Sequence, residues 1–144
     1  MTVSGVLVVD KPAGMTSHSV VARVRKALGL RKVGHAGTLD PDATGVLVVG
    51  VGQATRLLGF LMASDKEYLA TVVLGVATTT DDAAGEILTR ADATGIDTES
   101  LKAAMAALTG EIMQRPSAVS AIKVDGRRAH DRVRSGEDVE LAER

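Results

Sequence analysis

Two short aliphatic runs constrain the fold more than any other feature of the sequence. They are GVLVVD at residues 5–10 and GVLVVGVG at residues 45–52, each rich in valine and bounded by glycine or by Lys11-Pro12. Runs of this length and composition are typical of buried strands. Because the chain has one Phe, one Tyr and no Trp, the core that these strands enter must be aliphatic.

Apolar residues at helical spacing follow the first run, from Ser19 to Leu28, with Thr16 or Ser17 as the expected N-cap and Gly29 as the C-cap. Later stretches predict, in chain order, a helix at 53–64, a long strand at 66–78, a short strand at 86–90, a helix from Asp97 or Thr98 to Leu108, a hairpin around Asp125-Gly126, one or two helical turns at 129–136 and a last strand at 137–144. Because βαβ alternation is not sustained, these elements predict a mixed α+β domain. No closing element follows the last strand, so we expect the chain to be part of a larger domain.

The absence of cysteine excludes disulfides, zinc fingers and thiol nucleophiles. The N-terminus lacks the basic segment and the long apolar run of a signal peptide. No apolar run approaches the roughly 18 residues of a membrane-spanning helix. We therefore expect a soluble, cytoplasmic protein without a membrane partner.

The net charge of −1 hides an uneven distribution of charge. Residues 23–35 carry five basic side chains and no acid, and residues 115–134 carry six basic side chains against two aspartates. Two basic segments on an otherwise acidic chain suit a polyanionic ligand that touches one face. Ordinary solvated helix surfaces explain the same charges equally well.

The loop between the first predicted helix and the second aliphatic run reads VGHAGTLDPDATGVL, residues 33–47. A phosphate cradle is disfavoured, since neither G-x-x-x-x-G-K-[ST] nor G-x-G-x-x-G occurs. Metal ligation by His35, Asp40 and Asp42 fits no common ligand spacing. Two interpretations remain: Asp40 is a lone carboxylate acting as nucleophile or base, or Asp40 and Asp42 cap a turn. Spacing alone favours the turn caps.

The other candidate side chains are less informative. We expect His18, at the start of a helix, and His130, after a hairpin, to be solvated or packed rather than catalytic. Tyr68 is the only tyrosine. It fits either strand packing or a flat face that stacks on a nucleic-acid base.

Four stretches together resemble the TruB-type tRNA pseudouridine-55 synthases. They occur in the family's order and cover nearly the whole chain: GVLVVDKPAGMTSH, GHAGTLDPDATGVLVVGVGQATRL, DKEYLATVVLGVATTTDDAAGE and QRPSAVSAIKVDGRRAHDRVRSGE. The resemblance implies the pseudouridine synthase catalytic fold, a largely antiparallel mixed sheet flanked by helices. By the same resemblance, residues 1–144 are the N-terminal portion of that catalytic domain.

The resemblance also implies the roles of individual residues. Asp40 is the essential catalytic aspartate, Tyr68 packs against the target base, and His35 enters the T-loop of tRNA when the uridine leaves it. Lys11 and Pro12 support the catalytic loop from the first strand. We count them, with Tyr68 and His35, among the residues of the substrate-binding site. Phosphate contacts are expected from the basic segments, at Arg23, Arg31, Lys32, Lys123, Arg127 and Arg128.

The reaction of such enzymes breaks the N1–C1′ bond of the T-loop uridine, turns the uracil and rejoins it through C5. Whether the aspartate attacks C1′ or removes a proton on the way to a glycal stays open. The target nucleotide lies in folded RNA, so it must be flipped out and its lost stacking replaced. The isomerisation is redox-neutral, so we expect no cofactor and no metal. The expected partner is the T-arm of tRNA, bound by a monomer.

Family members continue well past residue 144, and we expect the missing part to supply an arginine that pairs with Asp40 and a C-terminal RNA-binding domain. This chain also carries Val119 and His130 where many relatives have aromatic residues. One alternative is a non-catalytic RNA-binding module on the synthase scaffold. Another is a metal-dependent hydrolase built on His35 and Asp42.

Overall fold

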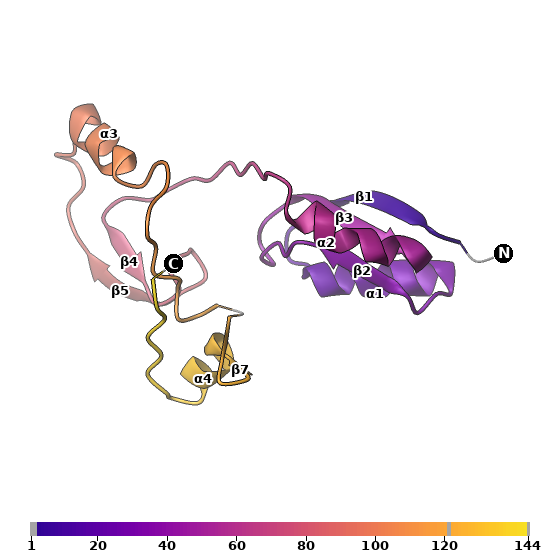
Figure 1. Cartoon of the computed structure of the whole chain (residues 1–144). Coiled ribbons are helices and arrows are strands. Elements are labelled where there is room, and N and C mark those ends of the chain that lie inside the picture. The colour runs from indigo at the N-terminus through magenta and orange to yellow at the C-terminus, as the bar shows by residue number, and fades with distance from the viewer. Residues whose placement is uncertain (1–2, 121, 144) are drawn as a thin grey trace. The chain divides into compact units, whose positions relative to one another are not determined.

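The computed structural model describes residues 3–120 and 122–143, which divide into two compact units, Met1–Leu69 and Ala70–Arg144 (Figure 1). The first unit holds strands β1 (Gly5–Lys11), β2 (Val33–Ala36) and β3 (Gly45–Val51), with helices α1 (Ser17–Leu28), η1 (Gly52–Leu57) and α2 (Leu58–Met62). The second holds β4 (Val76–Thr78), β5 (Ile87–Arg90), α3 (Thr98–Ala106), β6 (Lys123–Val124), β7 (Arg127–Arg128) and α4 (Ala129–Arg134). The predicted α+β class is confirmed.

The two aliphatic runs form the two longest strands of the first unit, as predicted. They pair antiparallel in the order β1-β3-β2, with Gly5 opposite Val51 and Lys11 opposite Gly45. β2 was not predicted: it joins as the other edge strand, with Val33 opposite Val51 and Ala36 opposite Val48. Its residues carry no alternating pattern, and only the hydrogen bonds that β3 offers make them a strand.

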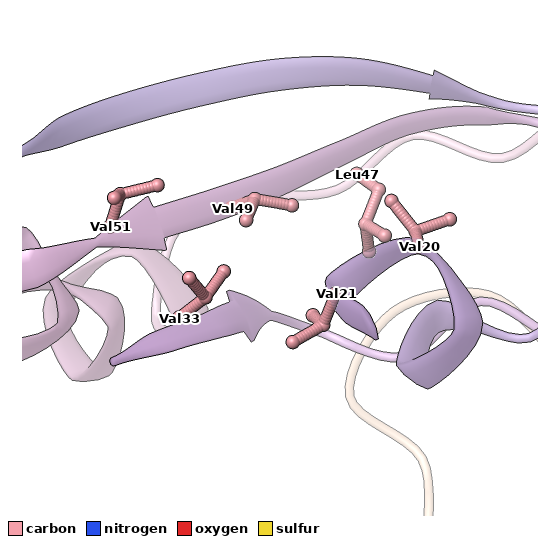
Figure 2. Packing of buried hydrophobic residues seen from close by; sticks show 6 residues of the cluster. All are labelled: Val20, Val21, Val33, Leu47, Val49 and Val51. Carbon is pink, nitrogen blue, oxygen red and sulfur yellow. The ribbon is translucent and has the colours of Figure 1, made fainter. Parts of the chain in front are cut away.

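The core of the first unit is aliphatic, as the scarcity of aromatic residues requires. Val20 and Val21 of α1 face Val33 of β2 and the alternate residues Leu47, Val49 and Val51 of β3 (Figure 2). Side chains directly opposite each other in a sheet lie on the same face. His35, which pairs with Val49, therefore lies on the face that α1 covers.

The other face of the sheet admits α2 because it is lined by glycine. Gly34 and Gly50 are opposite each other, and an added Cβ at either would lie 3.0 Å from a methyl carbon of Leu58. The helix predicted at 53–64 is present in two parts, the 3₁₀ helix η1 followed by α2.

The ends of α1 follow from its flanking residues. The Thr16 hydroxyl accepts the Ser19 N–H at 3.0 Å, and Gly29 ends the helix in the left-handed conformation. Arg25 and Lys26 in the last turn complement the negative end of the helix dipole. Both predicted caps are confirmed, with Thr16 rather than Ser17 at the N-cap.

The second unit contains two antiparallel strand pairs, β4 with β5 and β6 with β7. The hairpin predicted at Asp125-Gly126 and the helical turns after it are confirmed, as is α3, which Asp97 caps through the Ser100 N–H. A small cluster of Ala129, Val139 and Leu141 is buried.

Two strand predictions in this part of the sequence are wrong. Of residues 66–78 only Val76–Thr78 forms a strand, and Tyr68 lies in an extended segment without a ladder. Of residues 137–144 the described part, 137–143, is not a strand, although Val139 and Leu141 are buried. A strand is defined by its hydrogen-bonding partner, and only Val76–Thr78 has one in β5.

Candidate active site

The candidate site centres on the loop that joins β2 to β3, residues 37–44, on which Asp40 and Asp42 are both exposed. Within the described residues, no hydrogen bond or ion pair engages either carboxylate. The turn is closed by main-chain atoms, because the Asp40 carbonyl accepts the Ala43 N–H at 3.2 Å. A capping carboxylate would accept such N–H groups itself, so neither aspartate is the turn cap that spacing favoured.

The residue before Asp40 is held by a buried serine. Ser17, at the start of α1, is 1% exposed. Its hydroxyl accepts the Leu39 N–H at 3.0 Å and donates to the Leu39 carbonyl at 3.2 Å. One side chain thus satisfies both main-chain polar groups of a residue 22 positions along the chain.

The residue after Asp40 is held by a buried lysine. Lys11, at the end of β1, has no exposed surface, and its ammonium donates to the carbonyls of Pro12 at 3.0 Å, Met15 at 2.7 Å and Pro41 at 2.9 Å. These three bonds use all the donors of an ammonium group. Lys11 therefore contacts the loop, as its expected supporting role requires, and has no donor left for a ligand. Pro12 takes part through its carbonyl.

His35 lies at the end of β2, next to the loop. Its Nδ1 donates to the Gly37 carbonyl, which fixes the ring against the loop backbone. The His18 ring of α1 meets it edge to face, with ring centroids 5.2 Å apart and planes at 81°. His18 is thus packed against another histidine, which is one of the two states expected for it.

Tyr68 is 66% exposed and lies in the extended segment that follows α2. Two residues earlier, the Lys66 ammonium donates to the carbonyls of Met62 at 2.7 Å and Ser64 at 2.9 Å. The Lys66 side chain also lies against the loop, since its Cε is 3.7 Å from the Cβ position at Gly37. The start of the segment is therefore anchored beside the loop, whereas the described contacts do not join Tyr68 to Asp40.

The basic residues expected to contact phosphates fall into two sets. Arg23, Arg31 and Lys32 are exposed on the first unit, at α1 and the turn after it. Lys123, Arg127 and Arg128 are exposed on the β6–β7 hairpin of the second unit. A further basic residue, Arg25, is tied to the protein because its guanidinium donates to the Val33 carbonyl at 2.7 Å.

Arg127 forms an ion pair with an acidic residue, so its charge is not free to bind a phosphate. Its guanidinium pairs with Glu137 at 2.7 Å, and Arg132 pairs with the other oxygen of Glu137, also at 2.7 Å. Hydrogen bonds from Arg132, then Ser135, and the charge of Arg127 hold the pKa of Glu137 below its usual value. This cluster joins the hairpin to α4.

The described residues hold no group of three His, Asp or Glu side chains that could bind a metal ion, so the metal site considered for His35, Asp40 and Asp42 finds no support. None of the helices in the described ranges combines the length and the apolar character that a bilayer crossing requires.

Ser17 is the site residue that the sequence did not reveal. Its position beside a helix start suggested only a cap, and no local pattern signals a contact with a residue 22 positions away. The buried state of Lys11 was equally hidden, because lysine side chains are rarely fully buried.

Comparison with known proteins assigns the chain that carries this loop to a family. The family model described as TruB family pseudouridylate synthase (N terminal domain) matches residues 25–144. The chain belongs to this family. The matched residues include the exposed loop that carries Asp40.

Individual relatives agree with that membership. The tRNA pseudouridine synthase B of Cutibacterium acnes is 66% identical over 98% of this chain and 48% of its own length. The same enzyme of Rhodococcus jostii is 64% identical over 98% of this chain and 46% of its own length. The chain thus spans about half the length of the curated relatives it matches.

A solved structure shows a similar fold. The crystal structure of a Cbf5-Nop10-Gar1 complex contains a chain that is 33% identical, with a TM-score of 0.54, over 83% of this chain and 31% of that chain.

Proposed function

We propose that this chain carries the catalytic aspartate of a tRNA pseudouridine synthase, which isomerises the T-loop uridine at position 55. The observation that carries the proposal is the state of Asp40. Its carboxylate is exposed and unpartnered within the described residues, while the main chain on both sides of it is fixed by buried side chains. A residue held in place but left free at its functional atoms suits a reacting group.

The proposed chemistry needs one carboxylate and a flipped nucleotide. The N1–C1′ bond breaks, the uracil turns and C5 bonds to C1′; the proton on C5 leaves to solvent, and N1 takes up one proton in exchange. Asp40 acts at the sugar, either by attack at C1′ or by removing a proton on the glycal route. Redox equivalents and leaving groups are not involved, so the isomerisation is balanced without a cofactor.

Two further side chains serve the flipped nucleotide in this proposal. Tyr68, exposed and aromatic, stacks on the target base, and His35 takes the place that the base leaves in the T-loop. Stacking of this kind contributes about 1–3 kcal/mol per base. His35 suits its role because Gly37 and His18 fix its ring before RNA arrives.

The RNA backbone would be held by exposed basic residues, with Arg23, Arg31 and Lys32 on the first unit and Lys123 and Arg128 on the second. Arg127 is the weakest of the expected phosphate contacts, because Glu137 already neutralises it. Each phosphate contact that forms steepens the salt dependence of binding.

The test replaces Asp40 by Asn in the full-length protein. We expect the release of tritium from a T-arm RNA labelled at C5 of its uridine to fall by at least about 10²-fold, because the essential carboxylate is lost. Binding of the RNA should persist. Asp42→Asn is the matched control, since Asp42 is exposed on the same loop and equally unpartnered, and it should keep its activity.

Substantial turnover by Asp40→Asn would overturn the role of Asp40. Tight RNA binding without pseudouridine formation by the unaltered full-length protein would instead identify a non-catalytic RNA-binding module.

A further inference from the structure

We propose that Ser17 is a positioning residue for Asp40, and that it and Lys11 clamp the main chain on the two sides of the carboxylate. The expected effect on the reaction rate rests on the proposed function. The structural basis of the inference is independent of that function. Ser17 holds Leu39 and Lys11 holds Pro41, the two residues that flank Asp40.

The Ser17 contact is specific because it uses both capacities of one hydroxyl. The oxygen accepts the Leu39 N–H at 3.0 Å while its hydrogen is donated to the Leu39 carbonyl at 3.2 Å. A hydroxyl has only one hydrogen to donate. The Ser17 hydroxyl therefore uses its hydrogen for Leu39. By binding both the N–H and the carbonyl of Leu39, it fixes the orientation of the main chain at this residue.

Burial gives these hydrogen bonds their weight. Ser17 is 1% exposed and Lys11 is fully buried, so the side-chain ends of these hydrogen bonds are shielded from water. A polar group left unsatisfied in a buried position is destabilising, and the loop would shift to relieve it. Residues 11–17 provide both the lysine and the serine contact to the loop. The Lys11 ammonium also donates to the carbonyl of Met15, two residues before Ser17, and so ties the two ends of this segment together.

Asp40 itself lies outside this network. With its carboxylate unpartnered in the described part of the chain, the direction of the side chain is set by the main chain of residues 39–41. A displacement of about 1 Å in a reacting group can lower a rate by about 10²-fold. Loss of the Ser17 hydroxyl should therefore reduce the chemical step and leave RNA affinity almost unchanged.

The experiment uses the full-length protein with Ser17→Ala and Ser17→Cys. Single-turnover tritium release from C5-labelled T-arm RNA measures the chemical step, and filter binding of the same RNA measures affinity. We expect Ser17→Ala to lower the single-turnover rate about 10- to 100-fold with a change in Kd below about 3-fold. Ser17→Cys, which replaces the hydroxyl by a somewhat larger thiol that is still a weak donor, should lie between Ala and the unaltered protein.

Ser19→Ala is the matched control. Ser19 lies two residues further along α1 and is exposed, and its hydroxyl contacts only Thr16 among the described residues. Its N–H still reaches the Thr16 cap after substitution. This variant should retain the rate and the affinity of the unaltered protein.

Amide hydrogen exchange separates this inference from the proposed function, because it requires no activity. Ser17→Ala should speed the exchange of the Leu39 N–H while the exchange of the β3 amides is unchanged. Faster Leu39 exchange in Ser17→Ala, together with no pseudouridine formation by the unaltered protein, would uphold the clamp and refute the proposed function. An unchanged Leu39 exchange, or a single-turnover rate within about 2-fold of the unaltered protein, would overturn the clamp. A rate loss explained by weaker RNA binding alone would overturn it as well. If Ser17→Ala does not fold, Ser17→Cys is tested in its place, by the exchange of the Leu39 N–H and by the single-turnover rate.

Discussion

Gly52, at the junction of β3 and η1, combines two demands that only glycine meets. Its φ is +60°, and an added Cβ would lie 2.4 Å from the Ser4 hydroxyl oxygen and 2.5 Å from the Val3 carbonyl oxygen. The second of these is a main-chain atom, which cannot turn aside as a flexible side chain does. The junction keeps this close approach because Gln53 N–H donates to Ser4 at 3.0 Å.

We expect Gly52→Ala to destabilise the protein by about 2–4 kcal/mol, the sum of left-handed strain and overpacking. Gly29→Ala separates the two terms, because Gly29 has a φ of +64° with no described atom within 4 Å of its Cβ position. It should cost only about 1–2 kcal/mol. Thermal unfolding measures both variants, and equal shifts in Tm would show that the approach to Val3 carries no cost.

At the scale of residues, the sequence indicated which side chains lie near the Asp40 loop better than it indicated their contacts. Asp40, His35 and Lys11 were expected from the motifs, and the structure places all three at or beside one loop. The bonds from Ser17 to Leu39 were not expected, since only the folded chain brings those residues together. Composition and spacing report local preference, whereas such a contact depends on the path of the whole first unit.

The cluster of Arg127, Arg132 and Glu137 links the β6–β7 hairpin to α4 and makes the stability of this element depend on pH. The pKa of Glu137 is lowered in the folded protein, chiefly by its hydrogen bond from Arg132. A lowered folded-state pKa contributes stability that is present above the unfolded value, about 4.3, and is lost as the pH falls through the folded value.

Glu137→Gln mimics the protonated acid, so its effect should depend on pH. We expect the variant to have a lower Tm at pH 7 and to match the unaltered protein at a pH below the folded pKa of Glu137. Asp138→Asn, a neighbouring exposed acid, should change Tm little at either pH. A difference between Glu137→Gln and the unaltered protein that stays constant from pH 7 to about pH 3 would contradict the role of the cluster.

At the scale of elements, strands were predicted well where the run was long and its partner was equally apolar, as in β1 and β3. The run at 66–78 also contains several β-branched residues, yet Val72 and Val73 are exposed and only its last three residues pair. β2 shows the converse, because a partner made a strand from VGHA. Hydrogen-bond partners, which a single segment does not encode, decide both cases.

At the scale of the molecule, the chain spans about half the length of the curated relatives it matches, 48% of one and 46% of another. Asp40 has no cationic partner within the described residues. A carboxylate that must stabilise positive charge or attack a sugar depends on its surroundings for its reactivity.

We therefore expect residues 1–144, produced alone, to isomerise T-arm RNA at least about 10²-fold more slowly than the full-length protein, a loss of the size typical when one catalytic group is removed. Tritium release at equal concentrations measures the ratio, and circular dichroism confirms that the short chain is folded. A comparable rate for the two proteins would show that every group required for the reaction lies within these residues.

The side chains that hold the Asp40 loop precede it in the chain, since Lys11 and Ser17 come before Leu39 and Pro41. Protein synthesis proceeds from the N-terminus, and compact units can fold as they emerge from the ribosome. Residues 39–41 emerge after the side chains that bind them, and β3, which pairs with β1, emerges directly afterwards. The loop that carries the aspartate can thus form once the first unit, Met1–Leu69, has emerged, while the second unit is still being synthesised.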